Sequence, residues 1–297
     1  MKIRRTDFSR SVPFTPQGSW LERYFSQIGL DRSSLGIDHN TLAAIHRRQA
    51  DTIPFDMLDC FLPGEPAMDF PDIVDKILLG NRGGGCTQLN ELLACALETL
   101  GFAVRRGLSR VVDSATSLTP KTHKILIVEL DQELWLCDVG YGMNGPLEPI
   151  RIACNEPSVQ GIHRYRVPCV GDGEFELQRD TRQSWRTLYR FDLCSYRPEE
   201  FAPILFFNTR CSRSKFTRTL ICACPRYDGG SILLNNVLTT RSGGDRRRKI
   251  ARSPEELAQI VMEAFGIHLD VTMLGDLPFS FNQQEHAEAA EPNVRTA

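Results

Sequence analysis

The stretch His123–Gly140, HKILIVELDQELWLCDVG, predicts a β-hairpin that brings two polar side chains to one end of a sheet. Two apolar runs flank positions 131 and 132, which suits a two-residue turn. With that turn His123 lies opposite Gly140, and side chains along each strand alternate between the two faces. His123 and Asp138 therefore share a face near the open end of the hairpin. A one-residue bulge would break this relation, and the sequence does not exclude one.

A single cysteine stands upstream of the hairpin, in the stretch NRGGGCTQLNELLACALETLGF. Three glycines precede Cys86, and an amphipathic helix that stops at Gly101 is predicted to follow it. Free backbone N–H groups and the helix dipole favour a negative sulfur at such a place. The N–H groups around Gly85 to Thr87 can also supply part of an oxyanion site.

Cys86, His123 and Asp138 are the residue types of an acyl-transfer site. The imidazole activates the thiol, the carboxylate orients the imidazole, and the thiolate attacks a carbonyl and holds the acyl group as a thioester. Simpler readings stay open, because six histidines and ten cysteines make such a combination easy to compose by chance. Cys86 can pack a helix start, His123 can be a surface residue at a strand end, and Asp138 can cap a turn.

Composition and charge limit the function classes. The chain has 297 residues, 41% of them hydrophobic, and a formal net charge of −2, which gives no electrostatic reason to expect nucleic acid as a partner. No apolar run reaches the ~18 residues of a membrane span. The start, MKIRRTDFSRSVPF, has no apolar core of a secretory signal, so we expect a cytoplasmic protein that does not bind membranes. The ten scattered cysteines indicate mostly free thiols, and we expect no metal site.

Helix signals dominate the first hundred residues, and strand signals follow from Phe102. Apolar spacing and capping residues predict helices within 18–30, 38–55, 70–81 and 86–101. Short β-like runs occupy 103–112, 123–130, 133–142, 164–170, 216–224 and 231–242, and a last helix is expected over 253–267. The basic run GGDRRRK indicates a solvated hairpin tip, and the residues after 281 suit a disordered tail.

The sequence resembles the arylamine N-acetyltransferase family. The family's nucleophile motif, Arg-Gly-Gly-aromatic-Cys-x-Glu-x-Asn, stands here as RGGGCTQLN over 82–90, and IPFDMLD over 53–59 resembles its Ile-Pro-Phe-Glu-Asn-Leu segment. The hairpin falls where the family carries its catalytic histidine and aspartate. Later strands and the last helix extend the likeness to most of the chain, from about Trp20 to Leu269.

The resemblance implies an α+β fold with a papain-like Cys-His-Asp arrangement. Its parts would be an N-terminal helical bundle over 1–100 that carries the nucleophile, a central β-barrel over 101–205 that carries the histidine and aspartate, and a C-terminal α/β lid over 206–280, before the tail over 281–297. It also implies ping-pong chemistry. Acetyl-CoA, a cosubstrate rather than a bound cofactor, acetylates Cys86, and an aromatic amine or hydrazine then takes the acetyl group.

The same resemblance assigns roles around the site. His123 is the general base and then acid, Asp138 its orienter, and an ion pair of Arg82 with Asp56 is a scaffold for the active-site loop. By the family pattern the acceptor pocket is lined by Phe55 and Tyr141. The loop from Asp113 to Thr122 is a candidate lid against the pantetheine arm of CoA.

The motif departs from the family pattern in places. Gly85 stands where an aromatic residue is usual, Thr87 where one is frequent, Gln88 for Glu and Asp56 for Glu. Lost rings widen or reshape the acceptor site, and a lost charge alters the surroundings of the thiolate. An amide synthase of natural-product assembly, with a carrier-protein thioester as donor, is therefore an alternative. A cysteine hydrolase and a catalytically inactive ligand-binding relative are the others.

Overall fold

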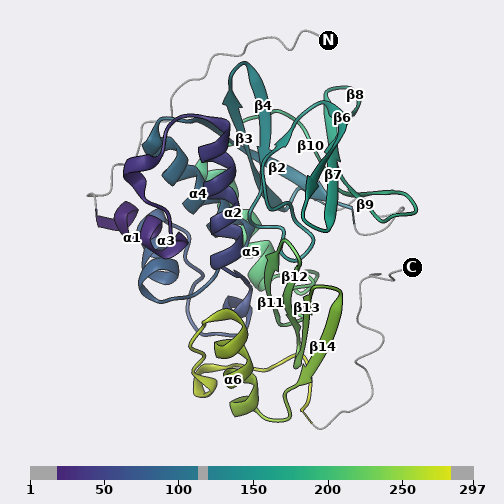
Figure 1. Cartoon of the computed structure of the whole chain (residues 1–297). Helices are drawn as coiled ribbons and strands as arrows, with labels where there is room; N and C mark the ends of the chain where they lie inside the picture. The colour runs from purple at the N-terminus through teal and green to yellow at the C-terminus, as the bar shows by residue number, and fades with distance from the viewer. Residues whose placement is uncertain (1–18, 113–119, 282–297) are drawn as a thin grey trace.

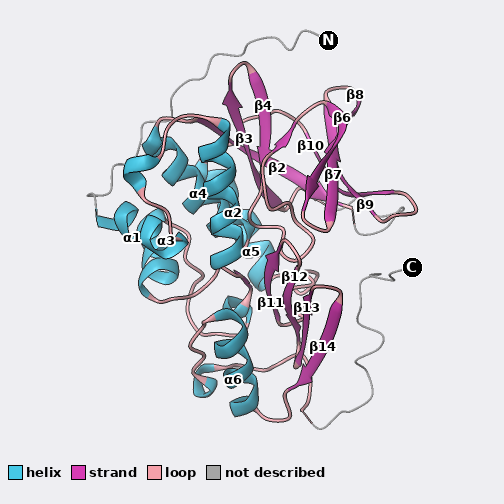
Figure 2. Cartoon of the chain, in the orientation of Figure 1, coloured by secondary structure: helices cyan, strands magenta, loops and turns pink. Residues whose placement is uncertain are grey.

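The computed structural model describes residues 19–112 and 120–281, and Figure 1 shows three groups of elements around a common centre. Helices α1 to α4 lie on one side, a large sheet stands beside them, and a smaller sheet with α6 lies below (Figure 2). Most of the candidate lid and all but the first residue of the predicted tail lie outside the described residues. No helix in the described ranges is both long and apolar enough to cross a bilayer.

The helices begin and end largely where capping signals predict them. Asp38 accepts a hydrogen bond from the N–H of Thr41, Ser253 accepts one from Glu256, and Gly101 ends α4 with a left-handed φ of 101°. The helices are α1 Ser19–Ile28, α2 His39–Thr52, α3 Phe70–Val74, α4 Cys86–Leu100, α5 Ala202–Arg210 and α6 Pro254–Phe265.

The segment predicted as one helix over 70–81 instead has two parts. Helix α3 ends at Val74, and a π-helical turn, Asp75–Leu79, follows it. The N–H of Gly80 bonds to the carbonyl of Asp75, five residues back, and the N–H of Arg82 bonds to the carbonyl of Lys76. These hydrogen bonds make the last turn of the helix wider than an α-helical turn. The chain then continues directly into the segment before Cys86.

The hairpin has the predicted register. Strands β3 (His123–Leu130) and β4 (Glu133–Cys137) pair without a bulge, from Leu130 opposite Glu133 to Leu126 opposite Cys137. Both turn residues, 131 and 132, have positive φ, as the primed two-residue turns require. The ladder ends at Cys137, so Gly140 does not pair with His123, and Asp138 lies just beyond the strand.

Nine antiparallel strands form the larger sheet, in the order β5-β4-β3-β2-β10-β9-β7-β6 with β8 on β9. The two ends of the sheet approach each other, because β5 at one end contacts β7 near the other. The sheet therefore forms a nearly closed barrel. Apolar side chains from six of its strands, β3, β4, β5, β7, β9 and β10, make its core. The remaining bounds are β2 Ala103–Val111, β5 Ile150–Arg151, β6 Cys154–Gln160, β7 His163–Val167, β8 Cys169–Gly171, β9 Glu174–Asp180 and β10 Trp185–Phe191.

The smaller sheet joins the two halves of the sequence. Its order is β1-β11-β12-β13-β14, and β1 (Phe55–Asp56) comes from the N-terminal half and pairs with β11. Phe55 also forms a parallel bridge with Gly84, which ties the segment before Cys86 to this sheet. The other bounds are β11 Ile221–Arg226, β12 Gly229–Leu234, β13 Val237–Ser242 and β14 Asp245–Ile250. Strand β14 is exposed throughout, as predicted for the basic run.

Helix α4 packs its apolar face against the hairpin strand β3. Leu89, Leu92 and Leu93 are fully buried in one core with Leu126 and Val128 of β3. Each buried leucine contributes about 1.5–3 kcal/mol relative to an exposed one. This packing sets the start of α4 against the start of β3, the two places where Cys86 and His123 stand.

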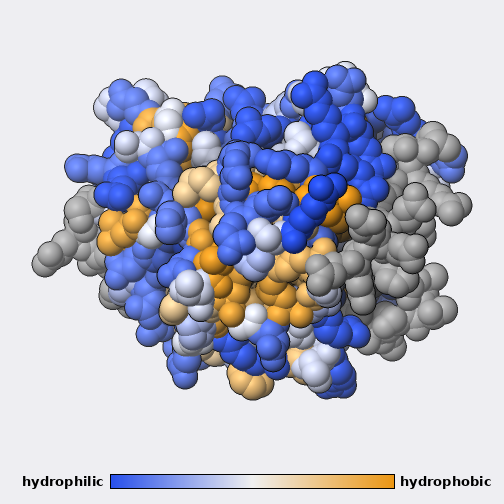
Figure 3. All heavy atoms as spheres, turned by 90° about the horizontal axis from the view of Figure 1, so that it is seen from below, coloured by the Kyte–Doolittle hydropathy of each residue, from blue (hydrophilic) through white to orange (hydrophobic). Residues whose placement is uncertain are grey.

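The face on the side of α6 and the smaller sheet is partly apolar. In Figure 3, which shows the molecule from below, apolar residues gather in the middle of this face and hydrophilic residues surround them. Partly buried apolar side chains around the α6 core belong to this part of the chain, among them Leu274, Leu277, Phe279 and Phe281.

Candidate active site

Cys86 is the first residue of α4 and is 6% exposed. Its Sγ lies 3.9 Å from the carbonyl oxygen of Thr122. As first-turn residues, Cys86 and Thr87 carry N–H groups that have no acceptor inside the helix. The N–H of Gly85, by contrast, donates to Gln88 Oε1 at 3.1 Å. Of the N–H groups expected around Gly85 to Thr87, the one of Gly85 is therefore already used, and those of Cys86 and Thr87 are left.

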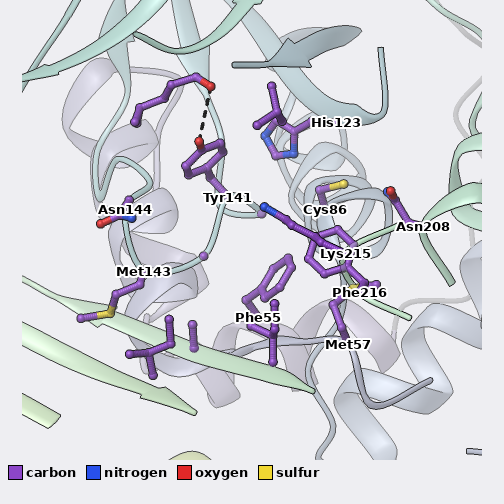
Figure 4. A pocket seen from close by; sticks show the side chains of 18 of the residues that line it. Phe55, Met57, Cys86, His123, Tyr141, Met143, Asn144, Asn208, Lys215 and Phe216 are labelled. Carbon is purple, nitrogen blue, oxygen red and sulfur yellow. Dashed lines mark hydrogen bonds between the residues drawn. The ribbon is translucent and has the colours of Figure 1, made fainter. Parts of the chain in front are cut away.

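His123 lies between the thiol and a carboxylate. Its Nε2 is 2.7 Å from Asp138 Oδ2, and both side chains are buried. Asp138 accepts the Nε2 hydrogen, so Nδ1 is left for Cys86, and Figure 4 shows the two side chains next to each other at the rim of the pocket. Burial alone would lower the pKa of His123, but the charges and hydrogen bonds of Asp138 and Cys86 raise it to about 10.

Four donors converge on the Asp138 carboxylate. Besides His123, they are Asn90 Nδ2 at 3.0 Å, the Tyr189 hydroxyl at 3.0 Å and the N–H of Gly140 at 2.9 Å. Burial would raise the pKa of Asp138, but the charge of His123 and the hydrogen bonds from His123, Asn90 and Gly140 lower it. The carboxylate is thus held ionised and in one orientation, which in turn holds the imidazole.

A neutral histidine supports the backbone at Asp138. His46 on α2 is fully buried, its Nδ1 lies 3.0 Å from the carbonyl of Leu147, and its Nε2 accepts the N–H of Asp138 at 3.0 Å. These partners require a hydrogen on Nδ1 and none on Nε2. Burial lowers the pKa of His46 to about 4, which agrees with a neutral ring.

Close approach of two segments requires a glycine at position 140. A Cβ on Gly140 would lie 2.6 Å from the Cα of Cys86 and 2.9 Å from Asn90 Nδ2. The chain after Asp138 therefore packs directly on the first turn of α4. A larger residue there would push the aspartate segment away from the cysteine.

A charged cluster holds the segment before Cys86. Arg82 donates to Asp56 Oδ2 at 2.8 Å and to Asp59 Oδ1 at 3.0 Å, so the expected partner of Arg82 is present together with a second one. Lys76 also binds Asp59, at 2.5 Å. Burial would raise the pKa of Asp56, but the charges of Arg82 and Lys76 lower it. Two cations and two carboxylates balance in this cluster.

Gln88 belongs to that cluster and not to the surroundings of the thiol. Its Oε1 accepts from Lys76 at 3.0 Å and from Gly85, and its Nε2 donates to the carbonyl of Ala67 at 2.8 Å. None of these contacts is with Cys86. Gln in place of Glu at position 88 therefore changes the charge of the loop scaffold and not that of the thiol's surroundings. In the scaffold, Asp59 supplies the carboxylate that pairs with Lys76.

A cavity of about 890 Å³ opens beside the thiol and the imidazole. Phe55, Tyr141 and Thr122, the three residues expected to bind substrate, all line it. The Tyr141 ring stands edge-on to His123, with centroids 5.4 Å apart, and Phe55 contacts Phe216 at 5.9 Å. Figure 4 shows these rings around the space in front of Cys86.

Met57 occupies the room that a ring at position 85 would need. A Cβ on Gly85 would lie 2.9 Å from Met57 Sδ, and Met57 is 4% exposed and lines the cavity. The space left by the absent ring beside the thiol is therefore partly filled by the flexible thioether of Met57.

We expect Gly85→Phe to destabilise the chain by about 1–3 kcal/mol, because the added ring overpacks the Met57 site. The backbone itself tolerates the change, since φ at Gly85 is −76°. Adding Met57→Ala should recover most of the loss, and denaturant unfolding of the two single variants and the double variant measures this. Strictly additive effects would contradict direct contact between the two positions.

Sequence reasoning missed several supporting residues. The position of Asn90 could have indicated its role, because it lies one turn after Cys86 on the same helix face. His46, Tyr189 and Met57 carried no such signal, since they come from distant segments. Together with Cys86, His123 and Asp138 they form a site equipped to hold an acyl group on sulfur.

The chain is similar to known acetyltransferases. A model of the N-acetyltransferase family matches residues 38–274. An arylamine N-acetyltransferase of Escherichia coli is 32% identical over 253 residues, 84% of this chain and 89% of that protein. An arylamine N-acetyltransferase / N-hydroxyarylamine O-acetyltransferase of Salmonella typhimurium is 30% identical over 273 residues, 91% of this chain and 94% of that protein.

Solved structures show the same fold. The arylamine N-acetyltransferase of Salmonella typhimurium superposes with a TM-score of 0.80 at 28% identity, over 89% of this chain and 96% of that chain. The enzyme from Mycobacterium abscessus gives 0.78 at 28% identity, over 87% and 97%. The Mycobacterium marinum enzyme, solved in complex with CoA, gives 0.75 at 24% identity, over 84% and 93%.

Proposed function

The chain belongs to the arylamine N-acetyltransferase family, and on this premise we propose that it moves an acetyl group from acetyl-CoA to an aromatic amine or hydrazine through a thioester on Cys86. The observation that carries the proposal is the buried contact of His123 with Asp138 beside Cys86 at the start of α4. Acetyl-CoA is the donor because the relatives are acetyltransferases and one of them is solved with CoA.

In the first half-reaction the Cys86 thiolate attacks the carbonyl carbon of the acetyl thioester, and the carbonyl oxygen takes up the negative charge. The first-turn N–H groups of Cys86 and Thr87 are the donors for that oxygen. The bond between the acyl carbon and the CoA sulfur then breaks. Protonated His123 gives its Nδ1 proton to the leaving sulfur, and the acetyl group stays on Cys86.

In the second half-reaction the acceptor nitrogen attacks the carbonyl carbon of the Cys86 thioester. Neutral His123 takes the proton that the nitrogen loses, and the Cys86 sulfur leaves as a thiolate. The amide product departs, and the thiolate–imidazolium pair is restored. Asp138 keeps the imidazole in the required tautomer through both steps.

The neighbouring residues have supporting roles in this proposal. Phe55 and Tyr141 hold the acceptor ring, Thr122 borders the donor, and Arg82 with Asp56 holds the loop before the nucleophile. The division of the chain into a bundle with the nucleophile, a barrel with the base and a covering third part remains part of the proposal, as does the cytoplasmic location expected from the sequence.

Acetyl-CoA alone tests the thioester. Intact mass spectrometry should show one acetyl adduct on the chain, and Cys86→Ala should abolish it. Cys60→Ala is the matched control, because burial and the Asp59 carboxylate raise the pKa of Cys60 to about 12 and that thiol stays protonated.

No adduct on the unaltered chain, or an adduct that survives Cys86→Ala, would overturn the proposal. An adduct formed only from a carrier-protein thioester would favour the amide-synthase alternative. An adduct that decays as fast in buffer as with an aromatic amine would favour a hydrolase.

A further inference from the structure

The same cavity contains a buried imidazole N–H for which the described residues offer no hydrogen-bond acceptor. His163, at the start of β7, is 8% exposed, and its Nδ1 accepts a hydrogen bond from Arg179 Nη2 at 2.8 Å. The hydrogen of the neutral ring is therefore on Nε2, and that atom has no hydrogen-bond partner in the described part of the chain. An unpaired buried donor is costly in a folded protein, so this group is suited to a ligand acceptor.

Two guanidinium groups stand close to this imidazole. Arg179 of β9 donates to His163 and to the side-chain oxygen of Asn144, and neither bond is to a carboxylate. Burial and the positive charges of Arg179 and Arg241 lower the pKa of His163 to about 4, so the ring stays neutral at physiological pH. Arg241 comes from β13, so the barrel and the smaller sheet both contribute.

The surrounding cavity is strongly cationic. Among its lining residues in the described part of the chain, arginine and lysine outnumber aspartate and glutamate by eight to two. Both acids are already paired, since Asp180 binds Arg164 at 3.2 Å and Asp59 binds Arg82. The lining therefore carries more positive than negative side chains.

This cationic region and the thiol share one cavity. The cavity is lined by His163, Arg179 and Arg241 as well as by Cys86 and His123. Figure 4 shows Asn144, the partner of Arg179, on the opposite side of the pocket from Cys86. A ligand whose reactive end reaches the sulfur can therefore extend toward the arginines.

We propose that Arg179, Arg241 and the Nε2–H of His163 bind an anionic group, a phosphate or a carboxylate, of a ligand whose other end reacts at Cys86. The inference rests on the proposed acyl transfer and adds a subsite to it. Two guanidinium groups and one neutral N–H supply charge-assisted hydrogen bonds to such a group. The anion belongs either to the nucleotide phosphates of the donor or to an acid group on the acceptor.

Inorganic pyrophosphate tests the subsite without catalysis. Titration calorimetry should show binding to the unaltered chain, weakened about tenfold or more by Arg179→Met, Arg241→Met or His163→Phe. Arg247→Met, on the exposed strand β14, is the matched control and should bind as the unaltered chain does. Circular dichroism and thermal unfolding check that each variant is folded.

Two kinetic comparisons identify the source of the anion. If it is a donor phosphate, the three variants should raise KM about tenfold for acetyl-CoA but not for S-acetylpantetheine, which lacks the nucleotide. If it is an acceptor acid, they should lower kcat/KM about tenfold for 4-aminobenzoate relative to aniline.

Variants that match Arg247→Met in pyrophosphate binding and in both kinetic comparisons would overturn the inference. Failure of the proposed function is a different result. In that case Cys86 forms no acetyl adduct in any chain, while pyrophosphate binding still reports on the subsite.

Discussion

Asp138→Asn is expected to slow acylation of Cys86 by about 10⁴-fold, the loss that the same change causes in a serine-protease triad. The carboxylate accepts the Nε2 hydrogen of His123 at 2.7 Å. An amide in its place can present its NH₂ to the ring, which moves the ring hydrogen to Nδ1 and blocks proton transfer from the thiol. Stopped-flow measurement of the acetylation rate with acetyl-CoA gives the effect.

The same substitution should change the titration of the imidazole. The charge of Asp138 is the largest of the contributions that raise the pKa of His123 to about 10. Without it, burial should bring the pKa of His123 down, and NMR titration of the labelled ring measures the shift. A folded variant that loses less than about tenfold in rate would show that Asp138 only supports the structure. Asp245→Asn, an exposed carboxylate on β14, is the control.

Glu91→Gln is expected to cost about 3–5 kcal/mol of stability, because it leaves two buried cations without their shared carboxylate. Glu91 on α4 accepts from Arg106 Nε at 2.9 Å and Nη2 at 2.8 Å, and it also binds Lys124 Nζ. The side chains of Arg106 and Lys124 are 9% and 3% exposed. Denaturant unfolding at neutral pH measures the loss.

Glu98→Gln is the matched control for this network. Glu98 also binds Arg106, but its side chain is 21% exposed and Arg106 keeps Glu91 when Glu98 is changed. We therefore expect a clearly smaller loss from Glu98→Gln. Equal losses from the two variants would show that the buried position of Glu91 does not matter.

The pH dependence of stability follows from the same carboxylate. Burial would raise the pKa of Glu91, but the positive charges and hydrogen bonds of Lys124 and Arg106 lower it from 4.5 to about 2. A depressed pKa adds stability above the unfolded value, and that stability is lost as the pH falls from about 4.5 to about 2. Over this range the unaltered chain should lose more stability than Glu91→Gln does.

This network also matters for the site, because it joins the elements that carry the reacting groups. Glu91 belongs to the helix that begins with Cys86, while Arg106 and Lys124 belong to β2 and β3, and Lys124 directly follows His123. The carbonyl of Lys124 accepts from Asn90 at 2.7 Å. The separation of thiol and imidazole is thus maintained by buried charge as well as by apolar packing.

Local sequence was enough to predict the parts of the site that depend on neighbouring residues. The two-residue turn at 131 and 132 determined the register of the hairpin up to Cys137, and His123 meets Asp138 just beyond the paired residues. The glycines before Cys86 and the apolar spacing after it determined that the thiol stands at a helix start. Turns, caps and side-chain periodicity depend on interactions within a few residues, so the chain encodes them locally.

Only the tertiary structure decided which distant groups complete the site. His46 meets the N–H of Asp138 across 92 residues, and Tyr189 meets its carboxylate across 51. The filling of the space at Gly85 by Met57, and the position of Arg241 near His163, likewise depend on how the helices and two sheets pack. Such contacts follow from the global arrangement of buried surfaces, which no local spacing specifies, so they could be found only once the chain was seen folded.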